Sequence, residues 1–469
     1  MKKKTIVTEF HRVIRWKKHL KAYNKKRKAK KDRLRRIFKQ DELSSDRLKS
    51  EQFKFEGARL LNELKVLNPH TRHATKREIK KRKVNFPIKG SFDIYEDPNS
   101  VFRTISTFRQ LALNPNIDVI YTIHDRANTC MSSEALLGIV AAEVSEYRGQ
   151  VKCPVKMHGH MKQSTSDKVL IGEVGIVGEL NNAEIHGGVG IIKQNVFLFK
   201  SDNKLFESAS LSAEDYKNET AIGCIKQLSK GLARFELRLM DGVEDELAMS
   251  LGEILDNAQE HCHRTSPSWY VRSFLNTDDS CLRYFELMVM NLGHSIAQTF
   301  EMLPDTSAAK ADAMSYARRH SNLFTTEELL TVAALQGNVS SKKDEDMTRG
   351  QGTIRLIETF ETISKEFVEL RGSGDTKKNC TPIMNIISGK TVITFNGKYK
   401  SKIVINEDGS EDVHIPFNQE ETLKLPPDST SISSMANTYF PGVMINIRIP
   451  LNGRTKTLKG NSQGINKYV

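Results

Sequence analysis

The sequence lacks the features that mark a secreted protein, a zinc-ribbon protein or a membrane protein. Its six cysteines are scattered and form no CxxC pair, which argues against a disulfide framework or a zinc ribbon and suits a reducing cytosol. The longest apolar run, residues 135–142, is far shorter than the roughly 18 residues needed to span a bilayer. No apolar segment of a signal peptide follows the basic N-terminus. We therefore expect a cytoplasmic protein without membrane contact.

The excess of positive charge is confined to the start of the chain. Residues 1–40 hold eighteen Lys and Arg against two acids, a net charge of +16, whereas the whole chain carries +14. A second basic cluster, residues 72–83, has seven basic residues against one acid. Such clusters bind nucleic acid by neutralising phosphates, but they also form solvated arms or dock on acidic proteins. We expect both clusters to bind non-specific nucleic acid or an acidic protein.

A chain of 469 residues is too long for one compact core, so we expect several domains. Composition divides it into a basic helical arm at 1–89, a small α/β domain at 90–215, a larger domain at 216–452 and a polar basic tail at 453–469. In the small domain, residues 117–123 predict a strand and residues 134–147 a helix after a polar turn. This unit looks like the sulfate-transporter and anti-sigma-antagonist (STAS) module.

Cys153, His158 and His160 in the small domain are candidate metal ligands. A fourth ligand at suitable spacing is missing, and His158 and His160 alternate within a mixed strand. This pattern is more typical of a structural role, which we favour over a metal site.

The larger domain contains a helical stretch around residues 251–262 with two side-chain stripes. The apolar stripe has the i, i+4, i+7, i+8 spacing of a helix buried on one side, and consists of Leu247, Leu251, Ile254, Leu255 and Ala258. Glu253, Asn257 and His261 recur every four residues and form a polar stripe beside it. An amphipathic helix often has a polar border of this kind, so the stripe alone does not establish a site.

Two glycine motifs follow this helix. The first, Asn291-Leu-Gly293-His-Ser295, comes directly after an apolar run of strand length at 284–290. The second, Gly350-Gln-Gly352-Thr353, precedes an apolar helical pattern. The polar section between them, 301–349, contains one clear helix at 326–335 and is long for an ordinary connection, so we expect it to act as a lid. A strictly alternating strand at 442–450 closes the domain.

Together these motifs resemble the GHKL ATPase family, which includes gyrase-type topoisomerases, Hsp90-like chaperones, histidine kinases and MutL-like proteins. The resemblance covers roughly residues 216–452 and implies an α+β fold with a Bergerat-type α/β sandwich that binds ATP and Mg²⁺. It makes Asn257 the magnesium ligand and Glu253 the base that orients or deprotonates water. It also places the residues of both glycine motifs and the helix end at the nucleotide, namely Asn291, Gly293, Ser295, Gly350, Gly352, Thr353 and His261.

The chain departs from the family pattern at Val443, where the family often has a Thr near the base, and at two positions of the first glycine motif. Asn291 replaces the Asp that reads adenine; its amide can accept a hydrogen bond but carries no charge. Ser295 replaces a glycine of the first motif. We therefore expect ATP binding more firmly than efficient hydrolysis.

The family includes several activities, and the sequence favours some of them over others. The helical stretch predicted at 220–239 contains no histidine, which argues against a histidine kinase. We expect no transducer or large middle domain after the motifs, and a topoisomerase, MutL-like protein or Hsp90-type chaperone would need one. We expect an ATP-dependent conformational switch. The alternatives are a serine/threonine kinase of the anti-sigma type and a nucleotide-binding module without turnover, with a protein partner or a homodimer as further partners.

Overall fold

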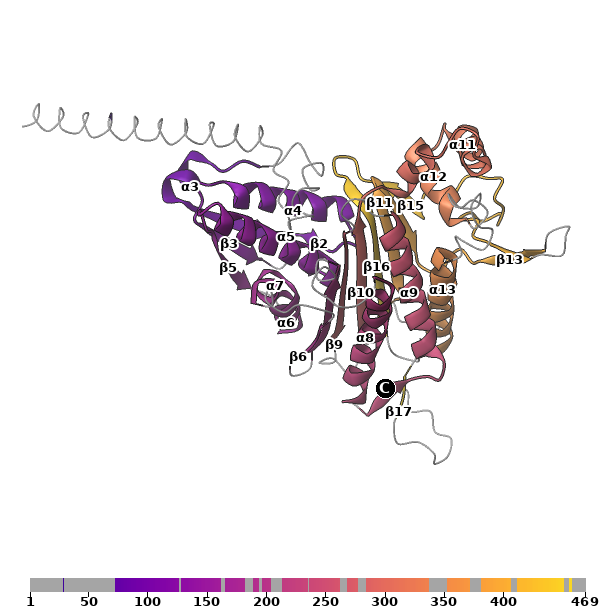
Figure 1. Ribbon diagram of the computed structural model, residues 1–469, viewed down its shortest axis with the longest axis horizontal. Helices are drawn as coiled ribbons and strands as arrows, with labels where there is room; N and C mark the ends of the chain where they lie inside the picture. The colour runs from indigo at the N-terminus through magenta and orange to yellow at the C-terminus, as the bar shows by residue number, and fades with distance from the viewer. Residues whose placement is uncertain are drawn as a thin grey trace, which may run out of the picture.

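The computed structural model consists of a small parallel sheet, a large antiparallel sheet and helices that pack on both (Figure 1). It describes Lys28 and the ranges 72–125, 128–161, 165–181, 189–193, 196–203, 213–234, 236–261, 268–276, 284–336, 352–371, 381–405, 411–450 and 455–457.

The small sheet has the strand order β1-β3-β5, and both pairings are parallel. Parallel strands need crossover connections, and the chain uses α4 between β1 and β3 and α5 between β3 and β5. The elements of this region are α3 (Lys76–Lys81), β1 (Lys83–Ile88), β2 (Ser91–Phe92), α4 (Pro98–Leu113), β3 (Val119–His124), β4 (Asn128–Thr129), α5 (Met131–Gln150), β5 (Lys156–Met161), α6 (Thr165–Val174) and α7 (Ile176–Asn181).

The large sheet has eight strands in the order β15-β12-β11-β16-β10-β9-β7-β6, and all its pairings are antiparallel. Its strands are β6 (Val189–Lys193), β7 (Val196–Asp202), β9 (Ser268–Asn276), β10 (Tyr284–Leu292), β11 (Ile383–Gly389), β12 (Thr391–Phe395), β15 (Ile432–Ser434) and β16 (Phe440–Pro450). Two short ribbons pair β13 (Lys402–Ile405) with β14 (Glu411–His414), and β17 (Thr455–Thr457) with β8 (Leu237–Leu239).

One face of the large sheet is covered by helices from residue 213 onward. These are α8 (Ala213–Ala233), α9 (Val243–His261), α10 (Ile296–Glu301), α11 (Ala308–His320), α12 (Thr326–Leu335) and α13 (Gly352–Arg371). Alternate residues of the central strands, such as Phe285, Leu287 and Val289 of β10, share one buried core with these helices. Helices segregated on one face of an antiparallel sheet are an α+β arrangement, which agrees with the α+β part of the predicted fold class.

The opposite face of the large sheet is covered by the small α/β region. The intervening residues of β10, Met288, Met290 and Leu292, belong to a second core that also contains residues of α4, α5 and the small sheet. Helix α5 contacts β9 and β10 directly. The molecule is therefore layered as small sheet, helices, large sheet and helices (Figure 1).

A buried polar network joins the two regions at the centre of the large sheet. Arg448 Nε lies 3.0 Å from Glu286 Oε1, and the backbone N–H of Met131, at the start of α5, donates to Glu286 Oε2 at 3.0 Å. Asn385 donates to the carbonyl of Ile94 at 3.0 Å. Burial raises the pKa of Glu286, although the Arg448 guanidinium opposes that shift. The network satisfies polar groups that would be costly to bury alone.

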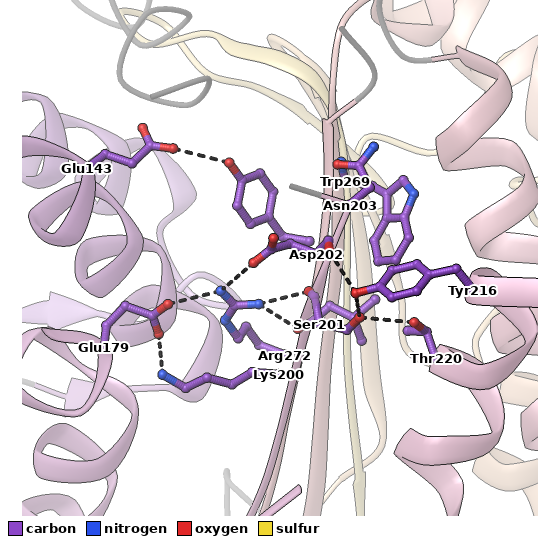
Figure 2. A network of polar contacts seen from close by, with 12 residues as sticks. Glu143, Glu179, Lys200, Ser201, Asp202, Asn203, Tyr216, Thr220, Trp269 and Arg272 are labelled. Carbon is purple, nitrogen blue, oxygen red and sulfur yellow. Dashed lines mark hydrogen bonds and ion pairs between the residues drawn. The ribbon is translucent and has the colours of Figure 1, made fainter. Parts of the chain in front are cut away.

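A second network joins α5 and α7 to strands β7 and β9 of the large sheet (Figure 2). Arg272 of β9 lies 3.0 Å from Glu179 of α7 and 3.6 Å from Asp202, and Lys200 also pairs with Glu179. Tyr270, on the same strand as Arg272, donates to Glu143 of α5 at 3.2 Å. The small α/β region is thus fixed to the large sheet by charged contacts at two places.

Several predicted elements differ from the structure in extent. Strands β6 and β7, within the range 90–215 expected for the small domain, belong to the large sheet, whereas β1, within the expected arm, belongs to the small sheet. The helix expected at 220–239 is α8 followed by the strand β8, and α11 was not predicted. The apolar face of α11 consists mainly of alanines (Ala309, Ala313 and Ala317), which give a weak periodic signal.

The two ends of the chain lie almost wholly outside the described residues. Of the expected arm at 1–89, residues 1–71 are described only at Lys28, and the tail is described only at 455–457. In the part of the chain that is described, no helix is long and apolar enough to cross a membrane.

Candidate functional site

Helix α9 carries the polar stripe predicted at 253–261. Its apolar residues Leu251, Ile254, Leu255 and Ala258 are buried against the large sheet, as the periodicity predicted. Glu253 and Asn257 are half-buried at the border of this face. His261 is the last residue of the helix, and its side chain lies outside the described part of the structure.

Asn291 lies on the large sheet, on the face that packs against α9. It lies two residues after Val289, so its side chain is on the face of β10 that packs against α9. Asn291 is only 4% exposed, and its Nδ2 is buried without a hydrogen-bond partner among the described residues. An unpaired buried amide costs about 1–3 kcal/mol, so this position is suited to a partner from outside the described chain.

The topology brings Asn257 and Asn291 to the same end of the large sheet. Six residues separate the end of α9 from Ser268, which begins β9 and pairs with Leu292. The last turns of α9 therefore lie at the Leu292 end of β10, where Asn291 is also found. The indole N–H of Trp269, at the start of β9, donates to Gln259 Oε1 in the last turn of α9 at 2.8 Å, which holds the end of α9 there.

Helix α13 begins at this same end. Ser364, late in α13, lies against Gly397, which follows β12 at the opposite end of the sheet. The hydroxyls of Ser250 in α9 and Thr359 in α13 are 3.2 Å apart. The two helices run in opposite directions. Asn257 lies seven residues after Ser250, and Gly352 lies seven residues before Thr359. Each step covers about 10 Å along its helix axis, so Asn257 is level with Gly352.

The first glycine motif forms a tight corner with the start of β16. The N–H of Gly293 donates to the carbonyl of Pro441 at 3.1 Å. Gly442 has φ +138°, and a Cβ there would come within 2.0 Å of the Asn291 carbonyl oxygen. The corner therefore requires glycine at 442, a residue that the sequence alone marks only as the start of a strand.

Ser295 caps helix α10. Its hydroxyl accepts from the N–H of Gln298 at 3.3 Å, and the Gln298 side chain accepts from the Ser295 N–H at 2.8 Å. The Tyr439 hydroxyl also hydrogen-bonds with Ser295, and burial raises the pKa of Tyr439. This capping box was not recognised from the sequence, although a Ser three residues before a Gln is its usual signature.

The second glycine motif lies at the limit of the described residues. Gly352 and Thr353 are the first two residues of α13, but the side chain of Thr353 is not among those described. Gly350 lies outside the described residues altogether. The first turn of a helix leaves its backbone N–H groups without partners within the helix. Because α13 begins at Gly352, these N–H groups lie at that point.

A cavity of about 20 Å³ beneath α9 is separate from this end of the sheet. Its lining is almost wholly apolar and includes Leu247, Phe285 and Ile449. Phe285 and Ile449 pair with each other near the opposite end of β10. The cavity offers no charge suited to a phosphate.

The candidate metal ligands of the small region are not gathered into a site. Cys153 accepts from Arg148 at 3.2 Å, whereas His158 and His160 are exposed on β5. Across the described ranges, no group of three or more His, Cys, Asp or Glu is placed to hold a metal ion.

Comparisons of the chain with protein-family models, with curated proteins and with solved structures found no match.

Proposed function

We propose that this chain binds Mg-ATP between α9, α13 and the Asn291 end of the large sheet, as a Bergerat-type ATPase of the GHKL class that acts as a conformational switch. The observation that carries the proposal is the buried Asn291 amide, which is unpaired among the described residues. It lies on the face of the sheet that packs against the helices, at the same end as Asn257 and Gly352. The supports are the position of these residues, the chemistry they offer and the resemblance of the motifs.

The nucleobase fits the Asn291 carboxamide. An Asn side chain offers one acceptor and two donors, and adenine presents an amino donor beside a ring-nitrogen acceptor. A base held there would satisfy the Nδ2 atom, which is buried without a partner in the described part of the chain. A carboxamide can also pair with guanine, so we expect a smaller preference for ATP over GTP than an aspartate would give.

The phosphates fit the start of α13. The N-terminus of a long helix presents free N–H groups and the positive end of the helix dipole, both of which bind phosphate. Gly352, the first residue of the helix, lets the backbone approach a ligand closely.

Asn257 and Glu253 supply the remaining chemistry. The Asn257 side-chain oxygen is a suitable single protein ligand for magnesium, which when bound would neutralise charge on the phosphates. Glu253 lies one turn earlier in α9 and is half-buried, so its carboxylate can hold and orient a water beside the terminal phosphate. Positioning and charge neutralisation are most of what phosphoryl transfer requires.

The fate of γ-labelled ATP tests the proposal. With Mg²⁺ and the full chain, we expect labelled phosphate in solution, and we expect Glu253→Ala to lower its release by about 10²- to 10⁴-fold while nucleotide still binds. Asp256→Ala is the matched control, because Asp256 is exposed on the same helix and pairs with Lys217 instead. Release that is equally fast in the Glu253 variant would refute the assignment of the base.

The same experiment separates the alternative functions. Label transferred to a serine or threonine of a protein would support the anti-sigma type of kinase. Nucleotide that binds without turnover would support a binding module. Absence of nucleotide binding would refute all three.

A further inference from the structure

The small parallel sheet has one face that the described residues leave open to solvent. Parallel sheets are usually covered on both faces, but here only the face toward α4 and α5 is buried. The open face carries Lys83 and Asn85 of β1, Tyr121 and Ile123 of β3, and His158 and His160 of β5. We call this surface the open face.

A row of three side chains crosses the open face at its centre. The parallel register sets Tyr121 beside His158, and the two rings stack with centroids 5.0 Å apart and planes 26° apart. On the other side of Tyr121, the Lys83 Nζ lies 3.7 Å from the centroid of its ring. His158 is exposed and has one ring face on Tyr121, so its other face is turned to solvent.

Positive charge surrounds this row. Lys156 extends from β5 on the same face, and α3, with Lys76, Lys80 and Lys81, leads directly into β1. At that end, the carboxylate of Asp118 is paired with Arg82. The open face therefore combines stacked planar rings with a basic border.

We propose that the open face binds single-stranded nucleic acid. Unpaired bases stack on exposed aromatic rings of a sheet, while lysines at its border neutralise the phosphates. A base would replace the Lys83 ammonium on the Tyr121 ring or extend the stack on His158, and Lys83 and Lys156 would bind the backbone. A duplex keeps its bases stacked inside the helix, so it cannot use this row.

The ring row favours nucleic acid over an acidic protein. An acidic peptide would be attracted by the lysines, but it needs no row of planar rings. The open face belongs to the small region and shares no residue with the proposed nucleotide site, so either proposal can fail without the other.

Fluorescence anisotropy with the full chain tests the proposal. The probes are labelled 15-mers of U and of dT, with an unlabelled duplex of the same length as competitor. We expect Tyr121→Leu and His158→Ala each to raise Kd about 5- to 30-fold, the effect of losing 1–2 kcal/mol of base stacking. Tyr121→Phe keeps the ring and should bind like the parent. His158 is exposed, so its variant tests the proposal even if Tyr121→Leu fails to fold.

The salt dependence tests the lysines separately. Replacing Lys83 and Lys156 by Met should flatten the slope of log K against log salt by roughly 0.7 for each phosphate that the variant no longer neutralises. Lys402→Met is the control, because Lys402 is an exposed lysine of β13 paired with Glu421. It should leave the slope unchanged.

Photo-crosslinking locates the bound strand. With 5-bromouridine in the 15-mer, we expect crosslinked peptides from β3 or β5. The proposal is overturned if both ring variants bind like the parent, if crosslinks fall only within residues 1–71, or if the duplex competes as well as the single strand. Polyglutamate that competes equally, with no effect of the ring variants, would identify an acidic-protein surface instead and would also overturn it.

Discussion

Two buried asparagines in central strands of the large sheet differ in whether their side-chain amides are hydrogen-bonded. Asn385 of β11 donates to the Ile94 carbonyl and accepts from Asn446 at 2.7 Å. Asn291 of β10 is similarly buried, but its Nδ2 has no partner among the residues that the structure describes. The hydrogen bonds of Asn385 stabilise the fold. Burying the unpaired Asn291 amide costs free energy, which a bound ligand would offset.

This difference predicts opposite effects of the same substitution. Asn291→Leu removes an unpaired amide, so the free energy of unfolding of the nucleotide-free protein should stay the same or rise by up to about 1 kcal/mol, while ATP binding is lost. Asn385→Leu leaves two partners unpaired and should cost about 2–3 kcal/mol. Urea denaturation of both variants measures this. Equal destabilisation by the two substitutions would mean that Asn291 is already paired without ligand.

At the scale of elements, α10, α11 and α12 are packed on the rest of the molecule, which limits how the lid expected at 301–349 could move. Phe300 of α10, Ala313 of α11 and Leu330 of α12 are buried in the same core as α9. Glu327, in the first turn of α12, accepts from the N–H of Lys390 at 2.7 Å and so ties that helix to the sheet. If nucleotide moves this part of the chain, the three helices have to shift as a packed unit. The rest of the expected lid, 337–349, lies outside the described residues.

The contact between α7 and β9 makes a prediction about pH. Burial raises the pKa of Glu179, but Arg272 and Lys200 outweigh it and leave the pKa below its ordinary 4.5. An acid with a lowered pKa stabilises the fold above its ordinary pKa, and this stability is lost as the pH falls through the folded value. Glu179→Gln should therefore lower the free energy of unfolding by about 3 kcal/mol at pH 7. This is the lower end of the range for breaking a buried ion pair, because Asp202 remains beside Arg272.

Urea denaturation between pH 7 and pH 3 checks this, since the gap between parent and Glu179→Gln should narrow below pH 4.5. Asp305→Asn is the control, because Asp305 also has a lowered pKa, next to Lys310, but is fully exposed. It should change the unfolding free energy little at any pH. A gap that stays constant for Glu179→Gln would contradict the account of this network.

At the scale of the whole molecule, local patterns were predictable and the packing between the two regions was not. The helix 326–335 was predicted with its observed bounds, because its polar first turn and its apolar run lie within ten consecutive residues. The polar residues Glu286 and Arg448, in contrast, alternate with apolar ones, a pattern typical of a solvent-facing side. Their partners, Met131 and Asp93, lie more than a hundred residues away, so no local pattern indicates that this face is buried.

For the candidate site, the sequence indicated which residues to consider but only part of their surroundings. The stripe on α9 and the order of the glycine motifs indicated the candidate residues, and the topology brings Asn257, Asn291 and Gly352 to one end of the sheet. The close approach of Gly442 to Asn291 could not be predicted, because it depends on how β16 pairs with β10.

The central claim, a Mg-ATP site at the Asn291 end of the large sheet, is tested most directly by calorimetric titration of the full chain with ATP. We predict one site per chain that requires Mg²⁺, and a Kd at least about tenfold weaker in Asn257→Ala, which corresponds to losing about 1.4 kcal/mol. No binding at millimolar ATP, or the same Kd in the parent and the Asn257 variant, would contradict the claim.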